Sequence, residues 1–302
     1  MSKVKAWVSA ARLRTLPLSV SGILMGAALA ALFGSSDSTI FVLALCTTVG
    51  FQVTSNLAND YGDGVKGTDN ADRIGPSRAL QSGRLSRKEL RNGIVLSVLL
   101  SFLLAMSLVL YAFKDSSIWY VFLFGFLGIA SLWASITYTV GEKAYGYMGL
   151  GDLFVFLFFG LLSVLGSMFL FTKALPVSAL LPATSIGLLS TGVLNLNNLR
   201  DYQSDSKARK QTLVVLMGIT RGKRYHYALL GMAFLCMLGF FSVHFKDWKT
   251  FLPLLAFVPV FIHLRSVILI KDPARFDPEL KKLALSTFLL AALSYLLFNY
   301  FL

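Results

Sequence analysis

The chain has few charged residues: they make up 14% of its 302 residues, whereas soluble domains carry about 25%. The charges that are present gather in short segments, separated by apolar stretches long enough to cross a membrane. Apolar residues make up 56% of the chain, and its mean hydropathy is +0.68. This combination nearly excludes a soluble enzyme and indicates a protein that crosses the membrane several times.

Cysteine and histidine are scarce as well. The two cysteines, Cys46 and Cys236, lie far apart inside apolar stretches, without a CxxC or Cys/His grouping. The three histidines lack the spacing of metal ligands, and the chain has no GxSxG or Walker sequence. These absences count against a zinc site, thiol redox chemistry, a serine hydrolase and a P-loop enzyme.

Acidic residues are outnumbered, with 15 Asp and Glu against 28 Lys and Arg, which gives a net charge of +13. Such a balance can indicate nucleic-acid binding, but here the basic residues flank apolar spans instead of lining one soluble face. Membrane topology and contact with anionic headgroups or anionic substrates explain the excess better. We therefore expect a lipid bilayer and no nucleic acid among the partners.

Nine apolar segments approach or reach the roughly 20 residues that a transmembrane helix needs. They are Leu16–Phe33, Ile40–Leu57, Ile94–Phe113, Ile118–Val140, Phe154–Phe171, Val177–Leu196, Tyr227–Val243, Phe251–Ile270 and Leu283–Leu302. The sequence Ser86-Arg87-Lys88-Glu89 is that of a capping box, which places the start of the third helix there. No polar block is long enough for a separate soluble domain, so residues 1–302 are predicted to form one all-α membrane domain. The first span is expected to remain in the protein, because residues 1–15 lack the pattern of a removable signal peptide.

The basic residues are distributed unequally between the two sides of these spans. With nine spans, 23 of the 28 lysines and arginines fall on the N-terminal side of the membrane and four on the other, and Arg265 lies within a span. Basic residues favour the cytoplasmic side. The bias predicts that the N-terminus lies in the cytoplasm and the C-terminus on the other side of the membrane.

Polar side chains gather where the second span ends. At 100° per residue, Asn56, Asn59, Asp60 and Asp63 fall within about 100° of one helical face. Carboxylates at a membrane boundary are costly unless they are paired with cations, and oxygen ligands of this kind suit a hard divalent ion. This helix end is therefore a candidate metal site.

The sixth span ends in the same way, because Asn197, Asp201 and Asp205 recur at intervals of four. The pattern Asn-x-x-x-Asp-Tyr begins at Asn56 and again at Asn197, so we expect two related helix ends to face one cavity. Basic residues follow both: Lys66, Arg73 and Arg78 after the first, Lys207, Arg209 and Lys210 after the second. Carboxylates for a metal beside cations for an oxyanion predict a metal-bridged diphosphate site. The alternative is a pair of solvated helix ends, which the repetition disfavours.

On these residues the chain resembles the UbiA superfamily of intramembrane aromatic prenyltransferases. Asn59-Asp60-Tyr61-Gly62-Asp63 matches the start of the first family motif, NDxxDxxxD, and Asp201 with Asp205 matches the second, DxxxD. The last aspartate of the first motif falls on Gly67, and Asp69 stands two residues later. The resemblance implies a bundle of nine transmembrane helices in a bacterial inner membrane, with a cap on the cytoplasmic side over a central cavity.

Within the superfamily, five stretches resemble the 1,4-dihydroxy-2-naphthoate prenyltransferases of menaquinone synthesis. These stretches are 11–17, 56–63, 72–76, 145–152 and 197–201. The resemblance implies transfer of a polyprenyl group from polyprenyl diphosphate to 1,4-dihydroxy-2-naphthoate, with decarboxylation, to give demethylmenaquinone. Mg²⁺ would assist ionisation to an allylic cation. The alternatives are another acceptor, such as 4-hydroxybenzoate, homogentisate or a porphyrin, or an ion-coupled transporter.

The resemblance also assigns roles to individual residues. The catalytic carboxylates are expected to be Asp60, Asp63, Asp201 and Asp205, and the Mg²⁺ ligands Asn56, Asp60, Asp63, Asp69, Asn197, Asp201 and Asp205. The diphosphate is expected on Lys66, Arg73, Lys210 and Arg12, although Arg12 also fits a purely topological role. Tyr138, Lys143, Tyr147 and Asp152 are expected to stabilise the cation or contact the acceptor.

Overall fold

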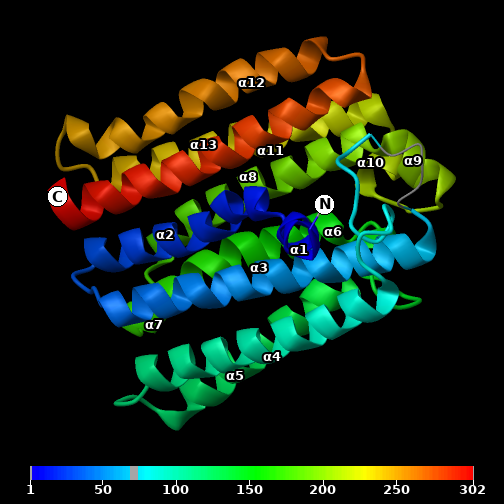
Figure 1. Cartoon of the computed structure of the whole chain (residues 1–302). Coiled ribbons are helices and arrows are strands. Elements are labelled where there is room, and N and C mark those ends of the chain that lie inside the picture. The colour runs from blue at the N-terminus through cyan, green and yellow to red at the C-terminus, as the bar shows by residue number, and fades with distance from the viewer. Residues whose placement is uncertain (1, 69–73, 302) are drawn as a thin grey trace.

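The computed structural model describes residues 2–68 and 74–301, so Asp69 and Arg73 lie outside the described residues. Within these ranges the chain forms helices and no strand, and an isolated β-bridge joins Met148 and Gln211. The described residues contain nine helical segments that are long and apolar enough to cross a membrane, which confirms the predicted number. The segments lie side by side, and the chain reverses direction from each to the next (Figure 1).

The helices are α1 (Lys3–Ala11), α2 (Leu16–Leu32), α3 (Ser38–Lys66), α4 (Arg87–Ala112), α5 (Ile118–Thr137), α6 (Gly151–Val155), α7 (Ser167–Thr172), α8 (Leu180–Arg200), α9 (Tyr202–Lys207), α10 (Leu213–Met217), α11 (Ile219–Val243), α12 (Phe257–Leu269) and α13 (Phe276–Leu296). The π-helical stretch η3 (Phe156–Gly166) continues α6 into α7, and η7 (Leu297–Phe301) extends α13. Short 3₁₀ segments are η1 (Leu13–Thr15), η2 (Tyr145–Tyr147), η4 (Val177–Ala179), η5 (Trp248–Ala256) and η6 (Pro273–Arg275).

Helix α3 extends well beyond the apolar span that the sequence predicts. It begins after Asp37, whose side chain accepts a hydrogen bond from the backbone N–H of Ile40, and it ends at Gly67, where φ is +72°. A glycine adopts this left-handed conformation without steric cost and so ends the helix. The first acidic segment therefore lies on the last turns of α3 and not on a loop. The predicted capping box of Ser86 and Glu89 is confirmed at the start of α4.

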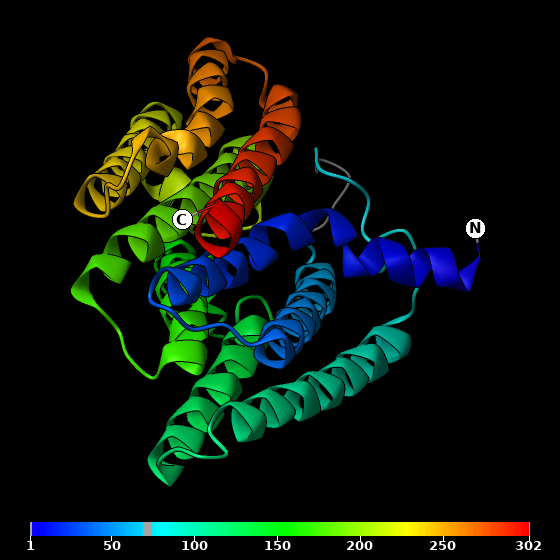
Figure 2. The same ribbon diagram turned by 90° about the vertical axis from the view of Figure 1, so that its left-hand side faces the viewer.

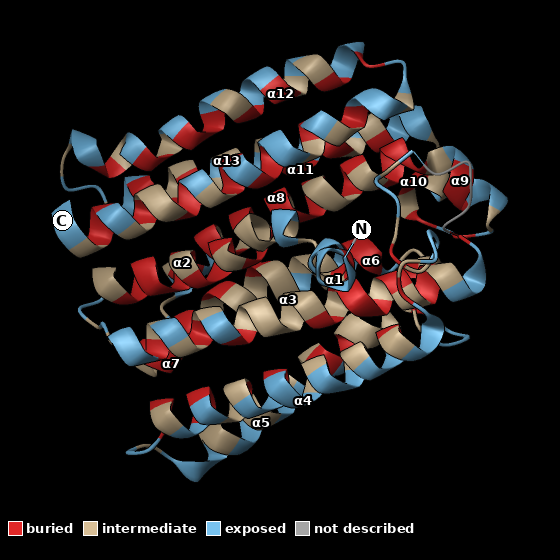
Figure 3. Cartoon of the chain, viewed as in Figure 1, coloured by how far each residue is buried: buried red, intermediate tan, exposed pale blue. Residues whose placement is uncertain are grey.

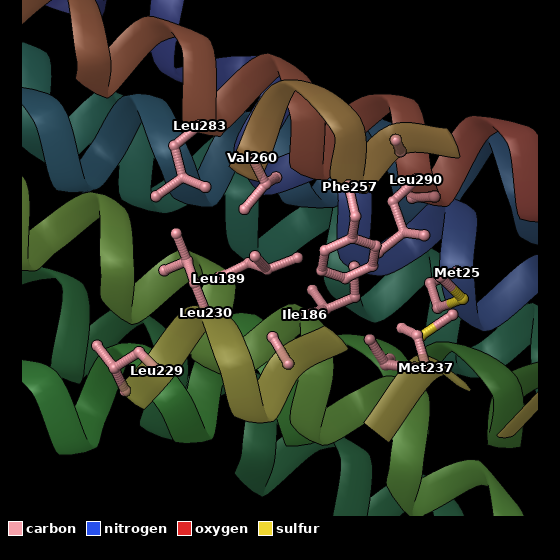
Figure 4. Packing of buried hydrophobic residues seen from close by; sticks show 14 of the residues in the cluster. Met25, Ile186, Leu189, Leu229, Leu230, Met237, Phe257, Val260, Leu283 and Leu290 are labelled. Carbon is pink, nitrogen blue, oxygen red and sulfur yellow. The ribbon is translucent and has the colours of Figure 1, made fainter. Parts of the chain in front are cut away.

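Helix α8 lies at the centre of the bundle. Figure 3 shows buried residues along α8, whereas α4 and α5 are more exposed on the outside. Figure 4 shows Ile186 and Leu189 of α8 packed among side chains of α11, α12 and α13. On another face, a Cβ atom on Gly160 of η3 would lie only 2.4 Å from the Cα atom of Gly187. Glycine thus allows these two spans to approach closely, as small residues do in membrane bundles.

Helix α1 projects sideways from the bundle (Figure 2). The chain turns at Arg12, where φ is +50°, and α1 packs on α3 and on the start of α4. The ring of Trp7 lies so close to Gly93 that an added Cβ there would be 2.5 Å from the ring. This contact fixes α1 beside the cavity described below.

A buried polar network joins α11, α12 and α13. The Nε2 atoms of His226 and His263 are 2.9 Å apart, and Nδ1 of His263 is 2.6 Å from Oε2 of Glu279. Lys282 donates a hydrogen bond of 2.6 Å to the other oxygen of Glu279. Buried polar groups need such partners, because an unpaired one costs about 1–3 kcal/mol.

We therefore expect Glu279→Ala to destabilise the bundle by about 2 kcal/mol, because it leaves His263 without an acceptor. Thermal unfolding in detergent should begin about 5 °C lower. Glu142→Ala, at an exposed position, is the control and should not move the transition. Equal midpoints for the two variants would contradict a stabilising role of the network.

Candidate active site

A polar cavity of about 650 Å³ opens near the end of the bundle where α9 lies (Figure 1). It is lined by residues of α1, α2, α3, α8, α9 and α13 and by the connection before α4. The acidic residues on its wall are Asp60, Asp63, Asp201, Asp205 and Asp277, and the basic ones are Arg12, Arg14, Arg78, Arg200, Lys210 and Lys281. The two acidic segments, whose first aspartates are Asp60 and Asp201, are far apart in the sequence, yet both face the same space.

The first acidic segment is held by the connection between α3 and α4. Asp60 is buried, and its two carboxylate oxygens accept hydrogen bonds from the backbone N–H groups of Ala79, at 3.0 Å, and Leu80, at 3.3 Å. This contact positions the neighbouring Arg78, whose guanidinium lies 3.6 Å from Oδ2 of Asp63. The other oxygen of Asp63 accepts a hydrogen bond of 2.7 Å from the hydroxyl of Tyr147.

The second acidic segment is held by Arg200, which is the last residue of α8 and is 3% exposed. Its guanidinium donates two hydrogen bonds of 2.8 Å to the carboxylate of Asp201 and one of 2.6 Å to Asn197. It also forms an ion pair with Asp277, at the start of α13. A planar guanidinium suits this two-point contact, and it ties the end of α8 to the last span.

Lys210 lies between the two segments. It is buried, and its Nζ atom is 3.8 Å from Oδ1 of Asp205. Burial by itself would lower the pKa of Lys210, but the carboxylates of Asp63 and Asp205 raise the pKa above its ordinary value. The ammonium group therefore stays charged and offers positive charge to an anion in the cavity.

A second cavity, of about 350 Å³, lies among α2, α3, α4, α5 and η3 and is lined mainly by apolar side chains. Six residues line both cavities: Gln52, Asn59, Tyr138, Val155, Phe159 and Leu194. Burial raises the pKa of the Tyr138 phenol to about 12, so it remains neutral at the junction. A polar compartment and an apolar one therefore adjoin, which suits a molecule with a charged head and a long apolar tail.

The donor atoms of the polar cavity fit Mg²⁺, a hard ion that binds oxygen. Among residues 2–68 and 74–301, no three acidic, histidine or cysteine side chains form a group that could hold a metal by themselves. Mg²⁺ is usually bound by one or two carboxylates together with substrate phosphates. The two separated acidic segments therefore suit an Mg²⁺ ion that is bound by carboxylates and a diphosphate together. They suit less well an ion that protein side chains alone would bind.

The structure brings most of the predicted residues together. Those on the wall of the polar cavity are Arg12, Asp60, Asp63, Tyr138, Asn197, Asp201, Asp205 and Lys210. Asn56, Lys66, Lys143, Tyr147 and Asp152 line neither cavity.

Each of these five residues has a different environment. Asn56 donates to the carbonyl of Ala11 and to Thr15, and Lys66 lies over the ring of Tyr147. Lys143 is exposed, and Asp152 is buried at the start of α6. Because these five residues line neither cavity, the structure does not favour direct contacts between them and a substrate. Their predicted contacts with metal, diphosphate or acceptor stay predictions.

Arg200, Asp277 and Lys281 also line the polar cavity, although the sequence pattern predicts no role for them. Arg200 directly precedes the first aspartate of the second segment, and an arginine at a buried helix end is itself an indication of an ion pair. Asp277 and Lys281 precede the predicted ninth span, which began at Leu283, whereas α13 begins at Phe276. The acidic residues of its first turn and Pro278 are typical of a helix start and could have identified it.

Two acidic segments around one cavity in a membrane bundle are the arrangement expected of an intramembrane prenyltransferase. The chain belongs to the UbiA prenyltransferase family, whose model matches residues 19–299. It is 43% identical over 290 residues to the 1,4-dihydroxy-2-naphthoate octaprenyltransferase of Haemophilus influenzae, covering 95% of this chain and 94% of that protein. It is also 43% identical to the enzyme of the same name from Escherichia coli, over 93% of this chain and 91% of that protein.

Among solved structures, the fold is similar to that of a UbiA homolog from Archaeoglobus fulgidus bound to DMAPP and Mg²⁺. The TM-score is 0.66 and the identity 15%, with 96% of this chain and 99% of that chain covered. At this identity the likeness supports the fold alone. The predicted all-α bundle of UbiA type is thereby confirmed.

Proposed function

We propose that this protein transfers a polyprenyl group from polyprenyl diphosphate to 1,4-dihydroxy-2-naphthoate. The acceptor loses its carboxyl group as CO₂, and the products are demethylmenaquinone in its quinol form and diphosphate. The observation that carries this proposal is the junction of a cation-rich, carboxylate-rich cavity with an apolar one. The two bacterial relatives named as 1,4-dihydroxy-2-naphthoate octaprenyltransferases support the choice of acceptor.

The polar cavity binds the diphosphate in this proposal. Arg78 and Lys210 face it with positive charge, and Asp63 and Asp201 are the carboxylates on its wall that would hold Mg²⁺. When bound, Mg²⁺ supplies positive charge that stabilises the leaving diphosphate. Asp69 and Arg73 lie outside the described residues, and their expected roles in metal and diphosphate binding remain part of the proposal.

The reacting carbon is placed where the two cavities meet, beside Tyr138. The allylic C–O bond breaks there, and its electron pair leaves with the diphosphate. A carbon–carbon bond then forms between the allylic carbon and the electron-rich acceptor ring. Loss of CO₂ returns an electron pair to the ring, so no external oxidant is needed. The apolar walls, such as Phe159 and Leu194, exclude the water that would otherwise capture the cation.

The membrane orientation forms part of the same proposal. The basic connections lie at the end of the bundle that carries the polar cavity, and basic residues favour the cytoplasm. The active site would then open at the cytoplasmic face of the inner membrane, with the prenyl tail among the spans.

The direct test uses the purified protein in detergent with 1,4-dihydroxy-2-naphthoate and octaprenyl diphosphate, with and without Mg²⁺. The expected result is a prenylated, decarboxylated product, identified by mass spectrometry, that forms only with Mg²⁺. Product from 4-hydroxybenzoate or homogentisate alone would contradict the proposed acceptor. The absence of product with every acceptor would contradict a prenyltransferase and favour the ion-coupled transporter.

The apolar cavity predicts an effect on prenyl-chain length. Gly128 lines this cavity, and the nearest atom to an added Cβ is 3.8 Å away, so a larger side chain can enter the space without a clash. Gly128→Leu should lower kcat/KM about tenfold for octaprenyl diphosphate relative to geranyl diphosphate. Gly125→Leu, one helical turn away and outside the cavity, is the matched control. An unchanged ratio for Gly128→Leu would place the tail elsewhere.

A further inference from the structure

Tyr147 contacts the first acidic segment and the chain that follows the second one, and it lines neither cavity. It belongs to η2, in the connection between α5 and α6, and its hydroxyl lies 2.7 Å from Oδ1 of Asp63 and 2.5 Å from the hydroxyl of Thr68. A phenol has one proton, which Tyr147 donates to the carboxylate. The hydroxyl of Thr68 therefore donates to Tyr147. This chain of two hydrogen bonds fixes the orientation of Asp63.

The ring and backbone of Tyr147 make contacts as well. The Nζ atom of Lys66, at the end of α3, lies 4.1 Å from the ring centroid, and that of Lys210 lies 5.3 Å from it. Both distances are within the range of a cation–π interaction. The carbonyl oxygen of Tyr147 accepts a hydrogen bond of 3.2 Å from the backbone N–H of Gln211. One residue thus contacts α3 on one side and the connection after α9 on the other.

These contacts favour a different role from the cation-stabilising one that the sequence predicts for Tyr147. Two ammonium groups already lie near the ring, and their charge disfavours a carbocation close by. The residue also lines neither cavity. A group that donates a hydrogen bond to a metal-ligating carboxylate, without itself facing the metal, orients that ligand. Loss of such a partner commonly lowers metal affinity 10- to 100-fold.

We propose that Tyr147 is a positioning residue for the metal site: its hydroxyl orients Asp63 for Mg²⁺, and its ring and carbonyl hold the Lys210 segment at a fixed distance from α3. The inference rests on the proposed function, because it takes Asp63 to be a metal ligand. Tyr147 acts through Asp63 and Lys210 and touches neither substrate nor the reacting carbon.

The test measures metal binding directly, by electron paramagnetic resonance of Mn²⁺ added to the purified protein together with inorganic diphosphate, which takes the place of the substrate phosphates. Tyr147→Phe removes the hydroxyl and keeps the ring between the lysines, and it should raise the Mn²⁺ dissociation constant about tenfold. The Mg²⁺ concentration for half-maximal transfer should rise by a similar factor, while kcat at saturating Mg²⁺ changes less. Tyr111→Phe is the matched control, because Tyr111 also donates to an aspartate, Asp37, but at the far end of the bundle. It should bind Mn²⁺ like the wild type.

Two further variants separate the possible failures. Thr68→Val removes the hydrogen-bond donor to Tyr147 without changing the tyrosine, and it should weaken Mn²⁺ binding severalfold. This variant keeps the test possible if Tyr147→Phe does not fold. Wild-type affinity in both Tyr147→Phe and Thr68→Val would overturn the positioning role. Asp63→Asn tests the underlying metal site: if it binds Mn²⁺ as the wild type does, the proposed metal site fails, and the inference fails with it. Loss of binding in Asp63→Asn alone would refute only the role of Tyr147.

Discussion

Asp63→Asn should lower the rate of prenyl transfer by about 100- to 1,000-fold while leaving the fold intact. The substitution keeps the shape of the side chain, and the asparagine oxygen can still accept the hydrogen bond from Tyr147. It removes the negative charge that faces Arg78 and the cavity. The substitution should therefore weaken metal binding and leave the packing of α3 unchanged. Initial rates at several Mg²⁺ concentrations, with thermal unfolding measured in parallel, check both parts of this expectation.

The matched control is Asp37→Asn. Asp37 is an N-cap at the opposite end of α3, where asparagine caps a helix as well as aspartate does. The control should retain wild-type activity and stability. Full activity in Asp63→Asn would remove Asp63 from the metal site, and a large drop in its thermal midpoint would assign it a structural role instead.

Arg200→Met should both destabilise the protein, by about 3 kcal/mol, and abolish transfer. The arginine is buried, and removing it leaves the carboxylate of Asp201 buried without its two-point partner. The link to Asp277 on α13 is lost at the same time. Thermal unfolding in detergent should shift downward by about 8 °C. Arg200→Lys restores the charge but not the planar fork, so it should recover only part of the stability.

The double variant Arg200→Met with Asp201→Asn separates the two effects. It removes the unpaired charge together with its partner, so the stability should return to within about 1 kcal/mol of the wild type. Transfer should remain lost, because the metal-facing carboxylate is absent. Arg275→Met, at an exposed position near the start of α13, is the control for loss of a positive charge. A double variant as unstable as Arg200→Met would show that the arginine stabilises the protein through other contacts.

Several features of this protein could be predicted from the sequence, because they depend on local patterns. The length and hydropathy of the apolar segments predicted the nine spans, and the Ser86–Glu89 pattern predicted the start of α4. The repeated Asn-x-x-x-Asp-Tyr pattern predicted that the two acidic segments face one cavity, and both do line it. The helix ends were less accurate, because charged residues such as those near Asp63 and Asp277 continue a helix beyond the apolar span.

The tertiary structure alone decided which partner each charged group has. Asp60 and the backbone of Ala79 and Leu80 meet only because the connection before α4 folds back over α3. Arg200 reaches Asp277 across 77 residues of sequence, and Tyr147 reaches Asp63 across 84. The sequence by itself thus determined the membrane class, the spans and the types of residue at the site. Only the packed bundle decided which of these residues pair with each other. Hydrogen bonds and ion pairs form over a few ångströms, and the local sequence pattern does not predict which distant residues come that close.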